Sequence, residues 1–221
     1  MSRTKLAERN LPDYTRGEEI FNMVTHIIGG GIGIAALVLC VIVAAYHRST
    51  AGVLTSIAFG VTMILLYTMS SIYHGLTHPM AKKVFQVLDH CTIYLLIAGT
   101  YTPITICAIR EVNNVAGWVL FGLMWFMAAV AITLNAIDLK RYKVFSMICY
   151  IGMGWGVIFA IKPTFIALTA GGFALLLGGG ICYTVGSILY GLRKRYTHSI
   201  FHIFVILGSA AHVLCILFYV L

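Results

Sequence analysis

Charged residues are scarce in this chain of 221 residues: they make up 10% of it, and only seven are acidic. A soluble domain of this length carries roughly a quarter charged residues to cover its surface. Hydrophobic residues reach 60%, and the mean hydropathy is strongly positive. The shortage of charge therefore excludes an ordinary soluble domain and indicates a polytopic membrane protein.

The sequence also lacks paired cysteine motifs and a cleavable signal peptide. The six cysteines fall inside apolar runs without any CxxC spacing, so neither a thiolate zinc site nor a disulfide framework is indicated. We interpret them as small buried hydrophobic residues. The first apolar stretch is too long for a signal peptide and has no Ala-x-Ala-like site before the next one, so we expect no cleavage.

Long apolar runs fill the rest of the chain after a polar tail, residues 1–18, which we expect to be flexible or interfacial. Each run is near the length of about 20 residues that a helix needs to cross a membrane. The runs cover roughly 20–46, 51–74, 84–108, 115–137, 144–161, 165–190 and 199–220, and the fifth is short. Their connections are brief. The sequence therefore predicts an all-α fold, with a single seven-helix transmembrane domain over residues 19–221.

Basic residues set the predicted orientation. Twelve of the 15 lysine and arginine residues lie in the tail and in the connections after the second, fourth and sixth runs. These are Arg3, Lys5, Arg9, Arg16, Lys82, Lys83, Lys140, Arg141, Lys143, Arg193, Lys194 and Arg195. Because cytoplasmic loops carry the excess of basic residues, the N-terminus should be cytoplasmic and the C-terminus outside. The same rule accounts for the net charge of +8, so we expect no nucleic-acid partner.

Polar residues converge on the predicted cytoplasmic side. His198 and His202 are four residues apart at the start of the last run, so they share one helical face. Ser70 and His74 lie at the cytoplasmic end of the second run, and Asp89 lies near the start of the third. The first run brings Glu19, Asn22 and His26 to the same level. Ionisable groups in a membrane are costly, so such a layer indicates a functional site.

Three histidines from two helices suit a zinc site whose fourth position is left for water. Asp89 is the one acidic residue clearly inside a run, and it could orient that water or move its proton. Ser70 lies one turn before His74 and could hydrogen-bond the water or support Asp89. A structural polar network without metal is the alternative that the residues leave open.

Two other histidines are weaker candidates. His212 is 14 residues beyond His198, roughly 21 Å along a helix. We expect it to be a core histidine outside the site. His90 follows Asp89 and points roughly 100° away from it around a helix.

Several spaced motifs resemble the hemolysin III family. They are Ser70-Ser71-Ile72-Tyr73-His74, Leu88-Asp89-His90, Ala98-Gly99-Thr100-Tyr101-Thr102-Pro103, His198-Ser199-Ile200-Phe201-His202, and Glu19, Asn22 and His26 in the first run. That family belongs with the progestin and adipoQ receptors, which include the adiponectin receptors, and more distantly resembles alkaline ceramidases. The lack of a long N-terminal domain is typical of its bacterial branch.

The resemblance implies a seven-helix bundle with a cytoplasmic N-terminus. It implies zinc ligands at His74, His198 and His202, with Ser70 and Asp89 engaging the zinc-bound water. Glu19, Asn22 and His26 match a further family motif; they are candidates for supporting the ligands, without a role assigned to each. A hormone ligand such as adiponectin is not implied.

The leading functional hypothesis is a zinc-dependent, ceramidase-like hydrolase of an amide or ester bond, in a membrane lipid, near the cytoplasmic leaflet. Asp89 would act as the general base. We expect the chain in the bacterial cytoplasmic membrane, with lipids as its partners. One alternative is a non-enzymatic, zinc-stabilised sensor or receptor-like protein of membrane homeostasis. Another is a cytolytic, hemolysin-like protein. A transporter is less favoured, because paired charges along a path across the membrane are missing.

Overall fold

The computed structural model describes residues 4–192 and 194–221, so Arg3 and Arg193 of the basic set lie outside the described residues. Every regular element in these two ranges is helical, which confirms the all-α fold. In chain order the elements are η1 (Leu6–Glu8), α1 (Arg16–Tyr46), α2 (Thr50–Gly75), α3 (Pro79–Pro103), η2 (Ile104–Ile109), α4 (Arg110–Val112), α5 (Asn114–Asp138), α6 (Lys143–Gly154), η3 (Gly156–Ala160), α7 (Ile161–Gly191) and α8 (Thr197–Tyr219).

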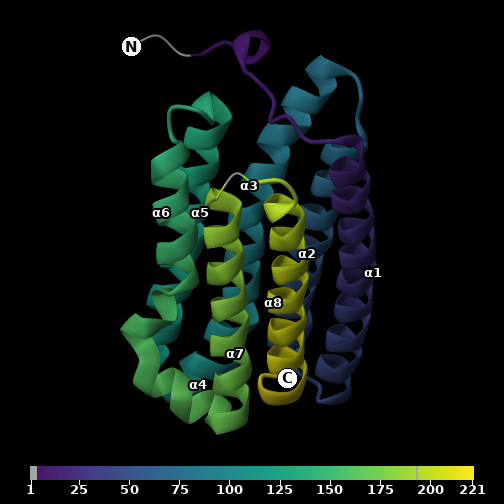
Figure 1. Ribbon diagram of the computed structural model, residues 1–221. Helices are drawn as coiled ribbons and strands as arrows, with labels where there is room; N and C mark the ends of the chain where they lie inside the picture. The colour runs from purple at the N-terminus through teal and green to yellow at the C-terminus, as the bar shows by residue number, and fades with distance from the viewer. Residues whose placement is uncertain (1–3, 193) are drawn as a thin grey trace.

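Six helical stretches of the described chain are long and apolar enough to cross a membrane. One of them, Lys143–Gly191, combines the fifth and sixth predicted runs, because α6, η3 and α7 follow one another without a loop. Trp155 Nε1 nevertheless donates a hydrogen bond to Thr184 Oγ1 at 3.0 Å. A straight helix would separate these two residues by roughly 44 Å. The stretch therefore folds back on itself (Figure 1). The count of seven crossings and the orientation of the termini stay predictions.

The outer face of α1 is apolar. Ile27, Ile34 and Ile42 follow one another at helical spacing, and each is more than half exposed. Such a face would be a large apolar patch on a soluble monomer, and it suits contact with lipid. The stretch that begins with α3, Pro79–Val112, is the most buried of the six.

Glycines let neighbouring helices approach closely. A Cβ atom on Gly29 of α1 would collide with the ring of Tyr67 on α2. A Cβ atom on Gly179 of α7 would collide with the ring of His212 on α8. Small residues at such contacts are the usual means of tight helix packing in membranes.

The helix ends that form the candidate site lie at one end of the bundle, which we call the upper end (Figure 1). There α1, α3 and α8 begin and α2 ends. Thr15 and Glu18 form a capping box at the start of α1: the Glu18 amide donates to Thr15 Oγ1 at 3.3 Å, and the Thr15 amide donates to Glu18 Oε2 at 2.9 Å. The other oxygen of this carboxylate, Oε1, accepts from the Tyr196 amide at 2.7 Å. The first turn of α1 and the start of α8 are thus held together.

Candidate metal centre

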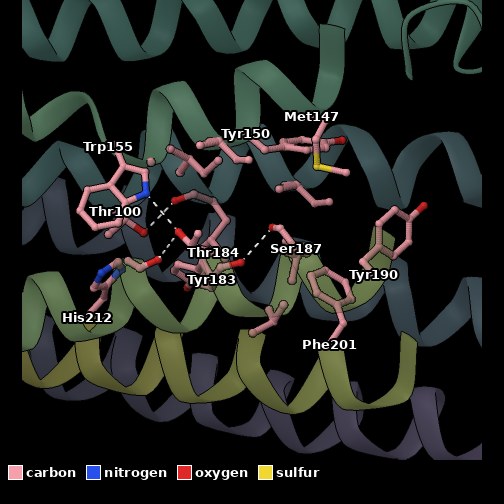
Figure 2. A pocket seen from close by; sticks show the side chains of 18 of the residues that line it. Thr100, Met147, Tyr150, Trp155, Tyr183, Thr184, Ser187, Tyr190, Phe201 and His212 are labelled. Carbon is pink, nitrogen blue, oxygen red and sulfur yellow. Dashed lines mark hydrogen bonds between the residues drawn. The ribbon is translucent and has the colours of Figure 1, made fainter. Parts of the chain in front are cut away.

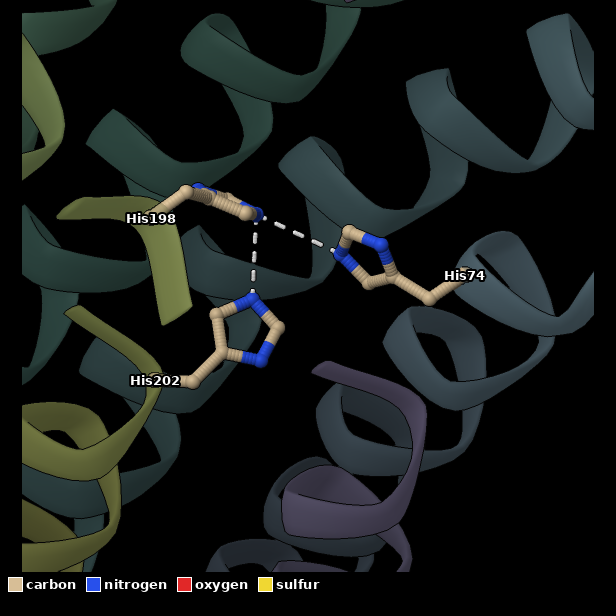
Figure 3. A group of neighbouring side chains, drawn as sticks. All are labelled: His74, His198 and His202. Atoms are coloured by element: carbon tan, nitrogen blue, oxygen red, sulfur yellow. Dashed lines mark hydrogen bonds between the residues drawn. The ribbon is translucent and has the colours of Figure 1, made fainter. Parts of the chain in front are cut away.

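Three imidazole rings from α2 and α8 meet at the upper end of the bundle (Figure 3). Nε2 of His198 lies 3.3 Å from Nε2 of His74 and 3.1 Å from Nε2 of His202. One nitrogen from each residue lies within 4.8 Å of the other two. The spacing of four residues along α8 puts His198 and His202 on one face, as the sequence predicts.

The donor set fits a metal ion. His198 Nε2 faces two other ring nitrogens but can supply one proton at most, so hydrogen bonds alone cannot satisfy all three groups. His74 and His202 are 3% and 1% exposed, where an unpaired polar atom is costly. A cation held by the three lone pairs removes this conflict. The cluster of His74, His198 and His202 could therefore hold a metal ion.

Glu19 of α1 fixes the ring of His74. Its Oε2 atom lies 2.6 Å from His74 Nδ1, and its Oε1 atom lies 2.9 Å from Lys82 Nζ on α3. Lys82 also donates to the carbonyl oxygen of Leu76 at 3.0 Å, just after α2 ends. With its Nδ1–H donating to the carboxylate, His74 presents the Nε2 lone pair to the centre of the cluster.

His26 and Asn22 lie beside the cluster. The ring of His26 stacks on that of His202, with centroids 3.7 Å apart and planes at 20°, and meets Tyr67 edge-on at 5.0 Å. Asn22 is completely buried. Within the described ranges, neither side chain has a hydrogen-bond partner. His26 is therefore placed to support a ligand ring, outside the group that could hold the ion.

Ser70 and Asp89 line a cavity of about 150 Å³ together with His198 and His202. This volume is far above the roughly 10–15 Å³ that one water molecule needs. Ser70 is 1% exposed, and the Asp89 carboxylate has His90 Nδ1 3.9 Å away. The structure thus brings both predicted residues to the cavity that the histidines share.

The cavity continues below the histidines between apolar side chains of α3, α6, α7 and α8 (Figure 2). His212 lines its lower part and contacts the carbonyl oxygen of Leu176 through Nε2 at 3.1 Å. His202 and His212 are separated by roughly 15 Å along α8. His212 is therefore outside the cluster, as expected, and the cavity extends along α8 by about half the roughly 30 Å thickness of a hydrocarbon core.

Comparison with known proteins settles the family. A family model described as "Haemolysin-III related" matches residues 14–213. The chain belongs to the haemolysin-III-related family. This confirms the resemblance inferred from the spaced motifs, and with the apolar helices it makes the chain a multi-pass integral protein of the bacterial cytoplasmic membrane.

Relatives of this haemolysin-III-related chain include two from Bacillus. It is 44% identical to "Hemolysin-3" of Bacillus cereus over 205 residues, covering 92% of each chain. It is 41% identical to "Hemolysin-3 homolog" of Bacillus subtilis (strain 168) over 207 residues, 93% of this chain and 96% of the relative. "Monocyte to macrophage differentiation factor" of Homo sapiens is 24% identical over 167 residues, 72% of this chain and 67% of the relative. This more distant relative fits the predicted wider superfamily.

Sequence reasoning on this haemolysin-III-related chain missed Tyr14. Its ring stacks on that of His198, with centroids 4.8 Å apart and planes at 13°, and lies 5.8 Å from the ring of His74. Burial raises the pKa of the Tyr14 phenol well above its ordinary value, so the hydroxyl stays protonated. The capping-box pair Thr15 and Glu18 was a usable signal, since it marks the start of a helix directly after Tyr14.

Proposed function

We propose that this protein is a zinc-dependent membrane hydrolase that cleaves an amide or ester bond of a lipid. The observation that carries the proposal is the buried group of three histidine nitrogens that borders a cavity lined by Ser70 and Asp89. Zn–N bonds of 2.0–2.1 Å would put tetrahedral ligand nitrogens about 3.3 Å apart, close to the contacts within the cluster. Three protein ligands with one open position are typical of catalytic zinc, whereas structural zinc has four.

The proposed topology has seven crossings with the upper end in the cytoplasm. The fold-back between Trp155 and Thr184 supports two crossings by Lys143–Gly191. The basic residues that gather in the tail and in the connections of the upper end support its cytoplasmic side. The metal centre then lies near the cytoplasmic leaflet.

In this proposal His74, His198 and His202 hold the ion, and Glu19 keeps the His74 ring oriented. When bound, the zinc ion would polarise the carbonyl of the scissile bond and make water more acidic. Ser70 would hold the attacking water through its hydroxyl group. Asp89 would take a proton from that water as it adds to the carbonyl carbon, and would then give the proton to the departing amine or alcohol.

The shape of the cavity supports a lipid substrate. Below the histidines most of its lining is apolar, with Leu96, Ile104 and Leu176 among the side chains that form it, although Thr100, Thr184 and His212 also line it. An acyl chain placed there would be removed from water along its length, which is favourable in proportion to the apolar area buried. The bond to be cleaved would then lie beside the histidines.

The test combines metal content with turnover. Purified wild-type protein should carry about one zinc ion per chain, and the His198→Ala/His202→Ala double variant should carry none. Asp89→Asn should keep its zinc but hydrolyse N-acyl and ester lipids on the order of 10²–10⁴ times more slowly than wild type. Full activity in Asp89→Asn would remove the proposed base. Well-folded wild type that carries no zinc would refute the metal centre.

A non-enzymatic metal staple is the second candidate. The cluster joins α2 to α8, and Glu19 and Lys82 add α1 and α3, so one ion would tie together four helices that are distant in the chain. This role predicts that removing zinc lowers the midpoint of thermal unfolding while no lipid is turned over. Measurable hydrolysis that depends on Asp89 would exclude it as the whole function.

The names of the Bacillus relatives raise cytolysis as a third candidate. It predicts that the purified chain releases a trapped dye from liposomes, in proportion to the amount of protein added. Liposomes that retain the dye would exclude this role.

A further inference from the structure

Residues 4–15, which we call the N-terminal strap, pass across the upper end of the bundle before α1 begins (Figure 1). The Thr4 amide donates to Asp138 Oδ2 at 2.8 Å, and Arg9 donates to the carbonyl oxygen of Ile137 at 3.1 Å. Lys83 Nζ donates to the carbonyl oxygen of Ala7 at 2.6 Å. The strap is thus tied to the end of α5 and to α3.

The strap ends over the histidines. Tyr14 is its last residue but one, and its ring lies parallel to that of His198 and beside that of His74. The next turn is locked by Glu18, which binds Thr15 on one side and the Tyr196 amide on the other. The ring of Tyr14 therefore covers the cluster from the side of the strap.

We propose that the N-terminal strap is a lid over the metal centre, and that Tyr14 is the residue that shields the histidines from the aqueous phase at the upper end. The metal ion in this proposal rests on the proposed function. That Tyr14 covers the histidines depends only on the contacts described above. Tyr14 acts through His198, so it is a positioning residue.

A lid of this kind can open without unfolding the bundle. Few hydrogen bonds tie the strap to α3 and α5, although Arg9 and Asp138 are buried, and local opening of such a terminal segment costs less than global unfolding. Exchange of ion and water with the upper aqueous phase would require the strap to lift. A lipid would instead enter through the apolar part of the cavity, between the helices.

The first test needs no metal. Full-length protein is stripped with a chelator and treated with diethylpyrocarbonate, and the rate of modification of His198 is followed by mass spectrometry. Loss of one aromatic stack in Tyr14→Ala should raise this rate by about tenfold, whereas Tyr14→Phe keeps the ring and should match wild type. Tyr46→Ala is the matched control, because Tyr46 is 83% exposed at the far end of α1. Equal rates in wild type and Tyr14→Ala would overturn the lid.

A second variant tests whether the effect comes from the strap rather than from a local defect at position 14. Arg9→Ala leaves the Tyr14 side chain unchanged but removes a hydrogen bond that holds the strap to Ile137, so the strap should lift more often and His198 should be modified faster. Zinc release to a chelator should be faster in both variants than in wild type, with the zinc content unchanged. Zinc-free wild type with faster labelling in Tyr14→Ala would refute the proposed function and keep the lid. Normal zinc with unchanged labelling would refute the lid and keep the metal centre.

Discussion

At the scale of single residues, the contact between Glu19 and His74 decides how the cluster presents its lone pairs. The carboxylate accepts a hydrogen bond from His74 Nδ1–H, and its negative charge is balanced by Lys82. A carboxylate behind a ligating histidine raises the basicity of the ring and fixes its tautomer. Glu19 thus has a clear place in the structure, which the sequence motif alone did not provide.

Glu19→Gln should weaken metal binding by about 10–100-fold, because the neutral amide can still accept the hydrogen bond but lacks the negative charge. Competitive titration with a zinc indicator would measure the change in Kd. Glu8→Gln is a suitable control, since Glu8 is an exposed acidic residue of the strap. An unchanged Kd in Glu19→Gln would show that the contact does not tune the site.

Residue positions on the helices were predictable, whereas side chains that reach in from outside them were not. The helical period and the direction of each span place His74, His198 and His202 at one depth. The period can be read from residue spacing, and the direction can be read from the distribution of basic residues. Tyr14 and Lys82 depend on how the tail folds and on the reach of a long flexible side chain. Neither property has a periodic signal in the sequence.

At the scale of elements, the start of α1 has a second task. Glu18 caps its own helix through Thr15 and also accepts from the Tyr196 amide, two residues before His198 of the histidine cluster. The capping box is visible in the sequence, but the link to Tyr196, far along the chain, is not. One carboxylate therefore couples the first helix to the first turn of the last.

Comparing Thr15→Ala with Glu18→Ala separates the two tasks. Thr15→Ala should cost about 1 kcal/mol through the lost cap alone. Glu18→Ala should in addition speed hydrogen exchange of the Tyr196 amide, which loses its acceptor. Exchange measured by mass spectrometry on peptides covering 190–200 would check this. Equal exchange at Tyr196 in the two variants would contradict the coupling.

The segment between α6 and the long part of α7 is more extended than hydropathy indicates. Lys162 and Pro163 separate the fifth and sixth predicted runs, yet both lie inside α7, which begins at Ile161. Proline is tolerated in the first turn of a helix, where its missing N–H would have no intrahelical partner. The regular α-helix is interrupted before this point, at η3 (Gly156–Ala160), and again after it, at Thr169, whose φ of 56° breaks α7. The predicted break therefore falls between two interruptions, and hydropathy does not detect either of them because both lie in apolar sequence.

At the scale of the whole molecule, the membrane topology decides which compartment the candidate metal centre faces. The described chain has six stretches able to cross, but the folded-back Lys143–Gly191 has the length for two crossings. Two crossings put Lys140 and Lys194 on the same side of the membrane, whereas one crossing would put them on opposite sides. The number of crossings therefore also decides on which side of the membrane the upper end and the N-terminal strap lie.

Single cysteines at exposed positions near the ends of the spanning stretches test the number of crossings and the orientation. Arg48→Cys and Lys162→Cys should react with a membrane-impermeant maleimide on intact cells, whereas Lys140→Cys and Lys194→Cys should react only after the cells are permeabilised. Wild-type protein measures the background of maleimide labelling, because its six cysteines lie within helical segments or in the buried interior. Labelling of Lys194→Cys but not Lys140→Cys on intact cells would mean a single crossing by Lys143–Gly191. Labelling of both on intact cells would place the strap and the histidines outside, and the proposed reaction would then belong to the outer leaflet.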